Sequence, residues 1–180
     1  NAYAKALYYW ELEFENDPKN TIELLIQTNY GLQQPEAAQG ILDYAKKNIL
    51  ADTVEEKEDW YEKLRKWKEA LVIYEKKEAV AGPDNFEILK GKLLCFRNLS
   101  DWENLSLQVE HMWNKYQEED MAKQSELKEI AEHACYSAWN LGEWENFQKY
   151  VKMLDSKNGY EKNFYQAILD VRNKKYVDAQ

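Results

Sequence analysis

The sequence contains few of the residues that interrupt or crosslink a chain. Only three prolines and six glycines occur among 180 residues, and they lie between periodic segments. Because Glu, Lys, Leu and Ala are abundant while helix breakers are sparse, the composition favours an all-α protein. The two cysteines, Cys95 and Cys135, are too few for a disulfide framework, and we interpret them as buried thiols in a reducing compartment.

Long apolar runs and basic clusters are also missing. No stretch approaches the ~20 apolar residues that span a bilayer, and no basic segment followed by an apolar one opens the chain. The net charge is −9, and no basic stripe is present that would replace the counterions of a nucleic acid. We therefore expect no nucleic-acid partner and no direct membrane insertion.

Motifs that carry catalysis are absent from the sequence as well. It has no Gly-rich phosphate loop, no Gly-x-Ser-x-Gly and no His-Glu-x-x-His. His133 and Cys135 flank Ala134, but on a helix their side chains point about 200° apart, so they cannot easily share a metal or form a nucleophilic pair. We expect no catalytic, cofactor-binding or metal-binding residue here, and no enzyme activity in this segment.

What the sequence does contain is helical periodicity, with 44% apolar and 14% aromatic residues. Apolar spacing predicts helices over 2–15, 21–31, 35–48, 55–65, 67–80, 85–98, 102–118, 121–141, 144–154 and 160–174, with another beginning at Tyr176. A turn is expected over 156–159. Thr21 or Asn20 is the expected N-cap of the second helix, and Ser100 or Asp101 that of the seventh. Gly142 suits a left-handed helix cap.

The turns between these helices form an internal repeat. Elbows near 32–35, 64–67, 99–102, 141–144 and 173–176 align at spacings of 32, 35, 42 and 32 residues, close to the ~34 of a tetratricopeptide hairpin. The aligned elbow residues are Pro35, Trp67, Trp102, Trp144 and Tyr176. Three positions earlier stand Leu32, Leu64, Leu99, Leu141 and Asn173. Three positions later stand Ala38, Ala70, Leu105, Phe147 and Ala179.

Packing gives each aligned position an expected role. The leucine closes the first helix on the second, the aromatic residue fills the corner, and the third residue marks the crossing. In the stretch Trp60–Lys77 we expect Leu64, Trp67, Ala70 and Tyr74 to be the anchors. Ala37, Ala38 and Gly40 are expected to allow a close helix approach. The prediction is an α-solenoid of tetratricopeptide-like hairpins, and the alternative is a compact bundle with tryptophans in its core.

Neither end of the chain looks capped. Because solenoids usually end in polar capping repeats, we expect residues 1–180 to be one segment of a longer helical-repeat domain that aggregates or loses its last helices when expressed alone. A tetratricopeptide groove can bind acidic peptide tails through basic and amide side chains. Lys90, Arg97 and Asn98 are candidates for that role, although ordinary exposure is the more economical interpretation.

Beyond the repeat, the chain resembles a known family. Five stretches are similar, in matching order, to the FAT domain of the target of rapamycin kinases, which belong to the phosphatidylinositol-3-kinase-related class. They are Ala4–Phe14, Leu32–Leu42 (LQQPEAAQGIL), Trp60–Lys77, Ala138–Trp144 (AWNLGEW) and Phe164–Leu169. The resemblance implies that this is the N-terminal part of a FAT domain, in which hairpins clamp the kinase domain of a large serine/threonine kinase and relay regulator binding in nutrient signalling.

The resemblance also implies partners and a location. The expected partners are the kinase domain and HEAT repeats of the same chain, and scaffold subunits of the kinase complex. The expected location is the cytoplasm, with peripheral association to lysosomal or vacuolar membranes. ATP and Mg would belong to the kinase domain of the parent, and no cofactor is expected in this segment. The alternative function is a free-standing tetratricopeptide-type adaptor for protein–protein interactions.

Overall fold

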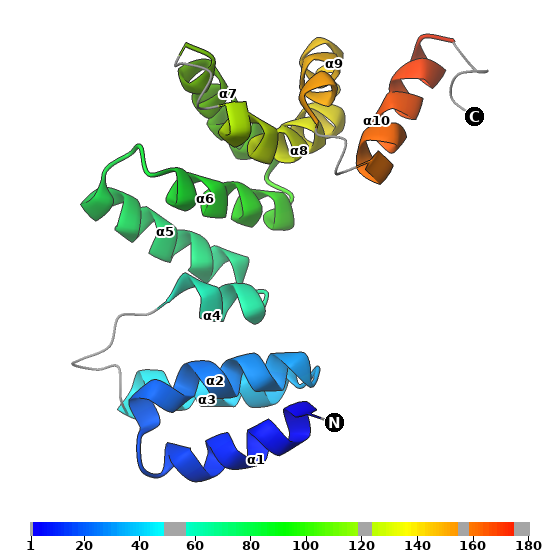
Figure 1. The fold of residues 1–180 in the computed structure, drawn as a ribbon. Coiled ribbons are helices and arrows are strands. Elements are labelled where there is room, and N and C mark those ends of the chain that lie inside the picture. Colours follow the sequence, from blue (N-terminus) through cyan, green and yellow to red (C-terminus); the bar gives the residue numbers. More distant parts are fainter. Residues whose placement is uncertain (1, 49–56, 119–123, 155–158, 175–180) are drawn as a thin grey trace. The chain divides into compact units, whose positions relative to one another are not determined.

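The described residues of this chain are all α-helix and connecting turn. The computed structural model describes residues 2–48, 57–118, 124–154 and 159–174. Most helices that follow one another within a unit pack together, and the predicted all-α solenoid class is confirmed (Figure 1). The chain divides into two compact units, Asn1–Pro83 and Asp84–Gln180.

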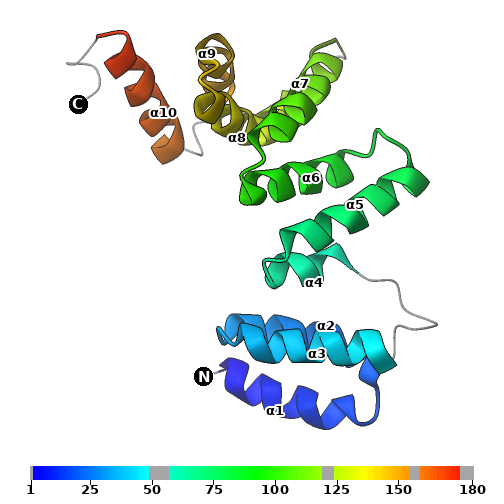
Figure 2. The ribbon, with the colours of Figure 1, turned by 180° about the vertical axis from the view of Figure 1, so that it is seen from behind.

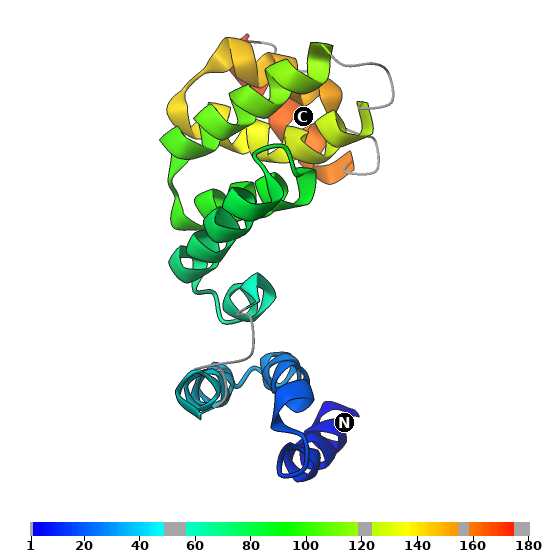
Figure 3. The ribbon, with the colours of Figure 1, turned by 90° about the vertical axis from the view of Figure 1, so that its left-hand side faces the viewer.

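The first unit contains three longer helices and a hairpin with a short first arm. Its helices are α1 (Ala2–Phe14), α2 (Pro18–Gly31), α3 (Pro35–Asn48), α4 (Glu58–Lys63) and α5 (Trp67–Ala81). α2 packs against α1, α3 and α4, and α4 packs against α5. Figure 3 shows α2 and α3 nearly along their axes and side by side. Ile22, Ile26, Leu42, Trp60 and Tyr61 are almost completely buried.

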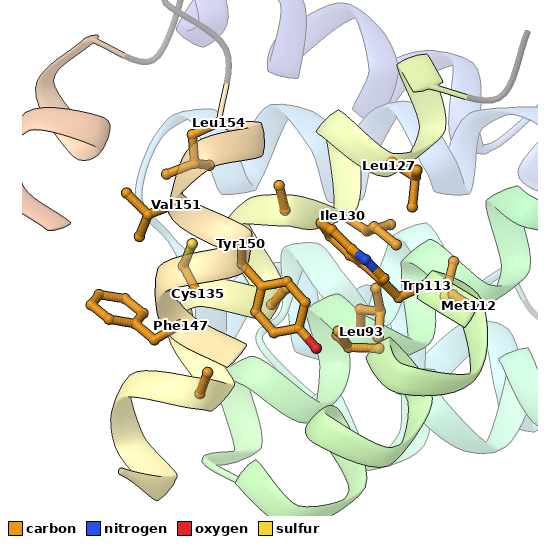
Figure 4. Packing of buried hydrophobic residues seen from close by; sticks show 14 of the residues in the cluster. Leu93, Met112, Trp113, Leu127, Ile130, Cys135, Phe147, Tyr150, Val151 and Leu154 are labelled. Carbon is orange, nitrogen blue, oxygen red and sulfur yellow. The ribbon is translucent and has the colours of Figure 1, made fainter. Parts of the chain in front are cut away.

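The second unit is built around its longest helix. It contains α6 (Phe86–Leu99), α7 (Trp102–Glu118), α8 (Gln124–Leu141), α9 (Trp144–Met153) and α10 (Gly159–Arg172). α8 contacts α6, α7 and α9, and α10 packs on α9 (Figure 2). Small residues on α8 allow these approaches, because Ala131, Ala134, Cys135 and Ala138 are all completely buried. Figure 4 shows this core, with Trp113 and Tyr150 from α7 and α9 lying against each other.

One backbone motif closes four of these helices. The residue after the helix, or the second one after it, has a positive φ: Gln33 (58°), Arg65 (55°), Ser100 (57°) and Gly142 (73°). The next residue then donates its N–H to the carbonyl five positions back, at 2.8–3.0 Å, for Gln34→Asn29, Lys66→Tyr61, Asp101→Phe96 and Glu143→Ala138. This is the Schellman closure, which satisfies carbonyls that a helix end leaves unpaired. Lys174 (60°) has the same left-handed conformation after α10.

The elbow residues themselves are less buried than the sequence suggested, whereas the residues expected at the helix crossing are buried. Three positions beyond the elbow aromatic or proline, Ala38, Ala70, Leu105 and Phe147 are each 0% exposed. The corner-filling role expected of the tryptophans is wrong in degree, because Trp67, Trp102 and Trp144 are only half-buried and Pro35 is exposed. Leu141 is 37% exposed. Each elbow residue is the first of its helix and lies at the edge of the contact, whereas the residue one turn later faces the preceding helix.

Within Trp60–Lys77 the anchors shift in the same way. Trp60 and Tyr61 are buried, as are the predicted anchors Ala70 and Tyr74, whereas Leu64 and Trp67 are half-buried. Of the three small residues expected at a close approach on α3, only Ala38 is buried. Ala37 is exposed, and a Cβ added at Gly40 would meet no atom within 4 Å.

The start of α2 corrects a predicted boundary. The helix begins at Pro18 instead of Thr21, and the Asp17 side chain, not that of Thr21 or Asn20, accepts the capping hydrogen bond from the Asn20 N–H. Proline suits the first helical position, because its missing N–H would be unpaired there anyway. At α7 the cap is Asp101, which accepts from the Asn104 N–H at 3.3 Å.

Some predictions fall outside the described ranges. They are the helix starts at 55 and 121, the turn residues 156–158, and the last elbow residues Tyr176 and Ala179. Among the helices that the structure describes, none combines the length and apolar character that a membrane crossing requires.

Candidate interaction site on the second unit

The basic residues that the sequence offered for a peptide groove lie on α6, and two of them pair with α8. The Lys90 ammonium lies 2.6 Å from a Glu129 carboxylate oxygen, and the Arg97 guanidinium lies 2.5 Å from Glu132. The hydrogen bond to Glu129 raises the pKa of Lys90 above its ordinary value. An incoming acidic peptide would have to displace carboxylates that are already in place, so α6 is a poor docking strip for acidic tails.

Asn98 does not join these two cations. Its side-chain amide donates to the Leu94 carbonyl one turn back at 2.8 Å, and the residue is exposed. The three candidates therefore do not form one binding surface. Lys90 and Arg97 instead connect α6 to α8, and the Arg97 pair is the better shielded, with 27% and 25% side-chain exposure against 40% and 47% for Lys90 and Glu129.

Arg97 also begins a continuous series of aromatic contacts, which we call the aromatic chain. Its guanidinium lies 4.3 Å from the centre of the Tyr136 ring on α8. Tyr136 meets Trp139 edge-on at 6.3 Å, and Trp139 meets Tyr165 of α10 at 6.2 Å. These contacts join side chains from three helices of the second unit.

The aromatic chain continues from α10 into α9 and ends on a second arginine. Tyr165 lies 5.6 Å from Phe147, which lies 6.1 Å from Trp144, and both pairs are edge-on. The Arg172 guanidinium stacks on Trp144 at 4.1 Å. Each edge-on ring pair stabilises the fold by ~0.5–1.5 kcal/mol beyond the effect of its buried area. The aromatic chain therefore stiffens the packing of α8, α9 and α10.

The aromatic chain was not predicted from the sequence. The available signal was the pair Tyr136 and Trp139, three residues apart on one face of a predicted helix, together with Phe164 and Tyr165. The pair alone does not reveal its partners, because those come from a helix almost 30 residues further along the sequence. The elbow residue Trp144 was predicted to fill the corner between two helices, whereas its half-buried ring stacks with the guanidinium of Arg172.

His133 and Cys135 lie in the same region without forming a chemical pair. Burial, with a smaller contribution from the Arg97 charge, lowers the pKa of His133 to about 4, and its Nδ1 has no hydrogen-bond partner. Burial raises the pKa of the Cys135 thiol well above its ordinary range, which keeps it protonated and a poor nucleophile. Figure 4 shows Cys135 inside the core near Phe147 and Val151. In the ranges that the structure describes, no three His, Cys, Asp or Glu residues gather as metal ligands.

Comparison with known proteins points to one family. The FAT domain family matches residues 131–180. Over 181 residues the chain is 39% identical to the serine/threonine-protein kinase TOR2 of Saccharomyces cerevisiae, covering 100% of this chain and 7% of that protein. It is 39% identical to tor1 of Schizosaccharomyces pombe over 184 residues, and 35% identical to mTor of Drosophila melanogaster over 182, each covering 99% of this chain. The chain spans about 7% of the length of these relatives.

Proposed function

Because the chain is a FAT-domain segment of the target of rapamycin serine/threonine kinases, we propose that it serves as a non-catalytic scaffold in such a kinase. Its tetratricopeptide-like hairpins would clamp the kinase domain and relay the binding of regulators to it. The segment would then act in growth and nutrient signalling through protein contacts and without chemistry of its own. The proposal rests on the family match and on the packing of the second unit.

The aromatic chain is the observation that carries this proposal. A relay needs elements that move together, and closely packed interiors transmit displacement because they have little free volume. The aromatic chain connects α6, α8, α9 and α10 through ring contacts of 5.6–6.3 Å, with an arginine at each end. A displacement at α10 would therefore be felt at α6.

Exposed apolar side chains supply surfaces for the proposed partners. On α1, Tyr8, Tyr9 and Leu12 are each at least 50% exposed and lie on one face of the helix. Tyrosines in such positions are typical of protein contact surfaces, since they bury a large area and keep a polar end. We assign this face to contacts with the HEAT repeats or kinase domain of the same chain, or with scaffold subunits of the complex.

The cofactor and location follow as parts of the same proposal. ATP and Mg would be held by the kinase domain of the parent protein, outside this segment. The parent would work in the cytoplasm and associate peripherally with lysosomal or vacuolar membranes. If the natural protein ended close to these 180 residues, the free-standing adaptor would replace the scaffold as the better interpretation.

A paired substitution in the full-length protein tests the scaffold role. Trp139→Leu removes the ring that contacts Tyr136, Phe164 and Tyr165, whereas Tyr160→Leu changes a side chain that is 87% exposed on α10. We expect Trp139→Leu to reduce protein kinase activity or the recovery of partner subunits, and Tyr160→Leu to leave both unchanged. Normal activity and normal assembly in the Trp139 variant would contradict the relay.

Crosslinking of the intact parent tests the clamp separately. Lysines in the stretch Trp60–Lys77 should crosslink to other helical-repeat segments or to the kinase domain. A complete lack of such crosslinks, with normal crosslinking elsewhere in the protein, would count against a scaffold position.

A further inference from the structure

A cavity in the first unit joins the ends of two helical hairpins. Residues of the elbow between α2 and α3 and of the elbow between α4 and α5 line a partly open cavity of about 670 Å³. This volume lies within the ~300–1,000 Å³ that is usual for ligand sites. Its lining includes Tyr30, Gln33, Pro35, Lys63, Leu64 and Arg65.

The charge of this cavity is opposite to that of the chain. The sequence has 33 acidic and 24 basic residues, yet the cavity lining contains two cations and no carboxylate. Lys63 is paired with Asp59 on its own helix at 2.5 Å, with 20% of its side chain exposed. Arg65 is exposed and forms no ion pair with any residue that the structure describes. Its guanidinium is therefore free to bind an external anion.

Apart from Gln33, the remaining lining is mainly apolar and partly open. Tyr30 is 47% exposed, Pro35 is exposed, and Leu64 is half-buried. Arginine and tyrosine are both enriched among the residues that contribute most binding energy at protein interfaces. The apolar part favours an occupant with an apolar side chain as well as a negative charge.

The fold fixes the backbone that carries Gln33 and Arg65. Arg65 has the left-handed conformation of the elbow, and hydrogen bonds from its own N–H to the Glu62 carbonyl at 2.9 Å and from Lys66 to Tyr61 at 2.8 Å fix the backbone on both sides. Gln33 occupies the equivalent position in the other elbow and donates its N–H to the Tyr30 carbonyl at 2.9 Å. A preformed site loses less conformational entropy when its partner binds.

From this charge complementarity, we propose that the cavity between the two elbows is a docking site for an acidic peptide segment of a partner protein. The Arg65 guanidinium would bind a carboxylate of the peptide in a two-point contact, and an adjacent apolar side chain would pack on Tyr30, Pro35 and Leu64. The site is built from residues of the first unit alone and does not depend on the proposed scaffold role.

Fluorescence anisotropy of a labelled peptide on the purified full-length protein tests the site. The probe is a fluorescein-labelled hexapeptide with two acidic residues on each side of a Leu-Phe pair. Arg65→Glu should weaken binding about tenfold or more, because it replaces a charge-assisted contact with repulsion. Lys76→Glu is the matched control, because Lys76 is an exposed residue on α5 of the same unit. The substitution changes the net charge by the same amount as Arg65→Glu. It should weaken binding less than about twofold.

Four outcomes would overturn the proposal. Equal effects of Arg65→Glu and Lys76→Glu, or a lack of any binding, would show that the cavity has no specific role. Competition by tripolyphosphate as effective as that by unlabelled peptide would identify a general anion site. Unchanged affinity for a probe with Gly-Gly in place of Leu-Phe would show that the apolar lining is not used. The second variant, Arg65→Gln, removes the charge without reversing it. An unchanged melting temperature of this variant would show that its loss of peptide binding does not come from misfolding.

Discussion

The burial of Phe147 predicts that it contributes more to stability than Trp144, the larger aromatic three residues before it. Phe147 is 0% exposed and its ring contacts both Trp144 and Tyr165, so Phe147→Ala leaves a cavity in the core of the second unit. Substitutions of this kind cost ~3–5 kcal/mol. Trp144→Ala removes a half-buried ring, one ring pair and the stacking of Arg172, which together amount to about 1–2 kcal/mol.

Amide hydrogen exchange in the full-length protein measures this difference locally. At about 1.4 kcal/mol for each factor of ten, Phe147→Ala should speed exchange in α8 and α9 by roughly two to nearly four orders of magnitude. Trp144→Ala should speed it by roughly one order of magnitude. Exchange in α2 and α3 of the first unit serves as the internal control and should not change. An effect of Trp144→Ala that equals or exceeds that of Phe147→Ala would refute the assignment of the buried position.

Three further predictions concern charge and backbone in the second unit. Burial lowers the pKa of His133 from 6.5 to about 4, so between these pH values the unfolded chain binds a proton that the folded chain does not. The stability of the fold should therefore decrease as the pH falls from about 6.5 to 4, by about 3 kcal/mol at most. Hydrogen exchange at pH 7 and pH 5, compared with that of His133→Gln, isolates this effect. Arg97→Ala should lower the free energy of unfolding by about 1–2 kcal/mol, since it breaks a partly shielded ion pair and the stacking on Tyr136. Lys90→Ala should lower it by less than ~1 kcal/mol, because that ion pair is more exposed. Equal losses in urea unfolding would show that the difference in exposure does not matter. Gly142→Ala should lower stability by roughly 1–2 kcal/mol because φ is +73° there, and an unchanged unfolding midpoint would show that the elbow can relax.

Helical periodicity and breaker residues were sufficient to predict the fold class. Pro35 and Gly142 have strong local preferences, and the structure places them at a helix start and a left-handed cap as expected. The start of α2 was missed because Pro18 was treated as a break. The same residue is favourable at the first helical position, and only the cap geometry of Asp17 distinguishes the two cases.

The interaction surfaces could be predicted only in part. The sequence identified Lys90 and Arg97 as cations on one face of a helix, but it could not show that Glu129 and Glu132, about 35 residues later, neutralise them. The cavity beside Arg65 could not be predicted for the same reason, because its lining comes from two elbows about 30 residues apart in the sequence. Contacts between distant segments depend on packing angles that periodicity does not encode.

The Schellman closure of the elbows has a consequence for how such a chain can change over evolution. The closure is made by main-chain hydrogen bonds alone, so the side chain at its left-handed residue is not required for the turn. The five residues with this conformation are accordingly an amide, a guanidinium, a hydroxyl, a hydrogen and an ammonium: Gln33, Arg65, Ser100, Gly142 and Lys174. Each elbow thus offers one position at which the chemical identity of the surface can be exchanged while the path of the backbone stays the same. Partner preference can change at these positions without redesign of the core.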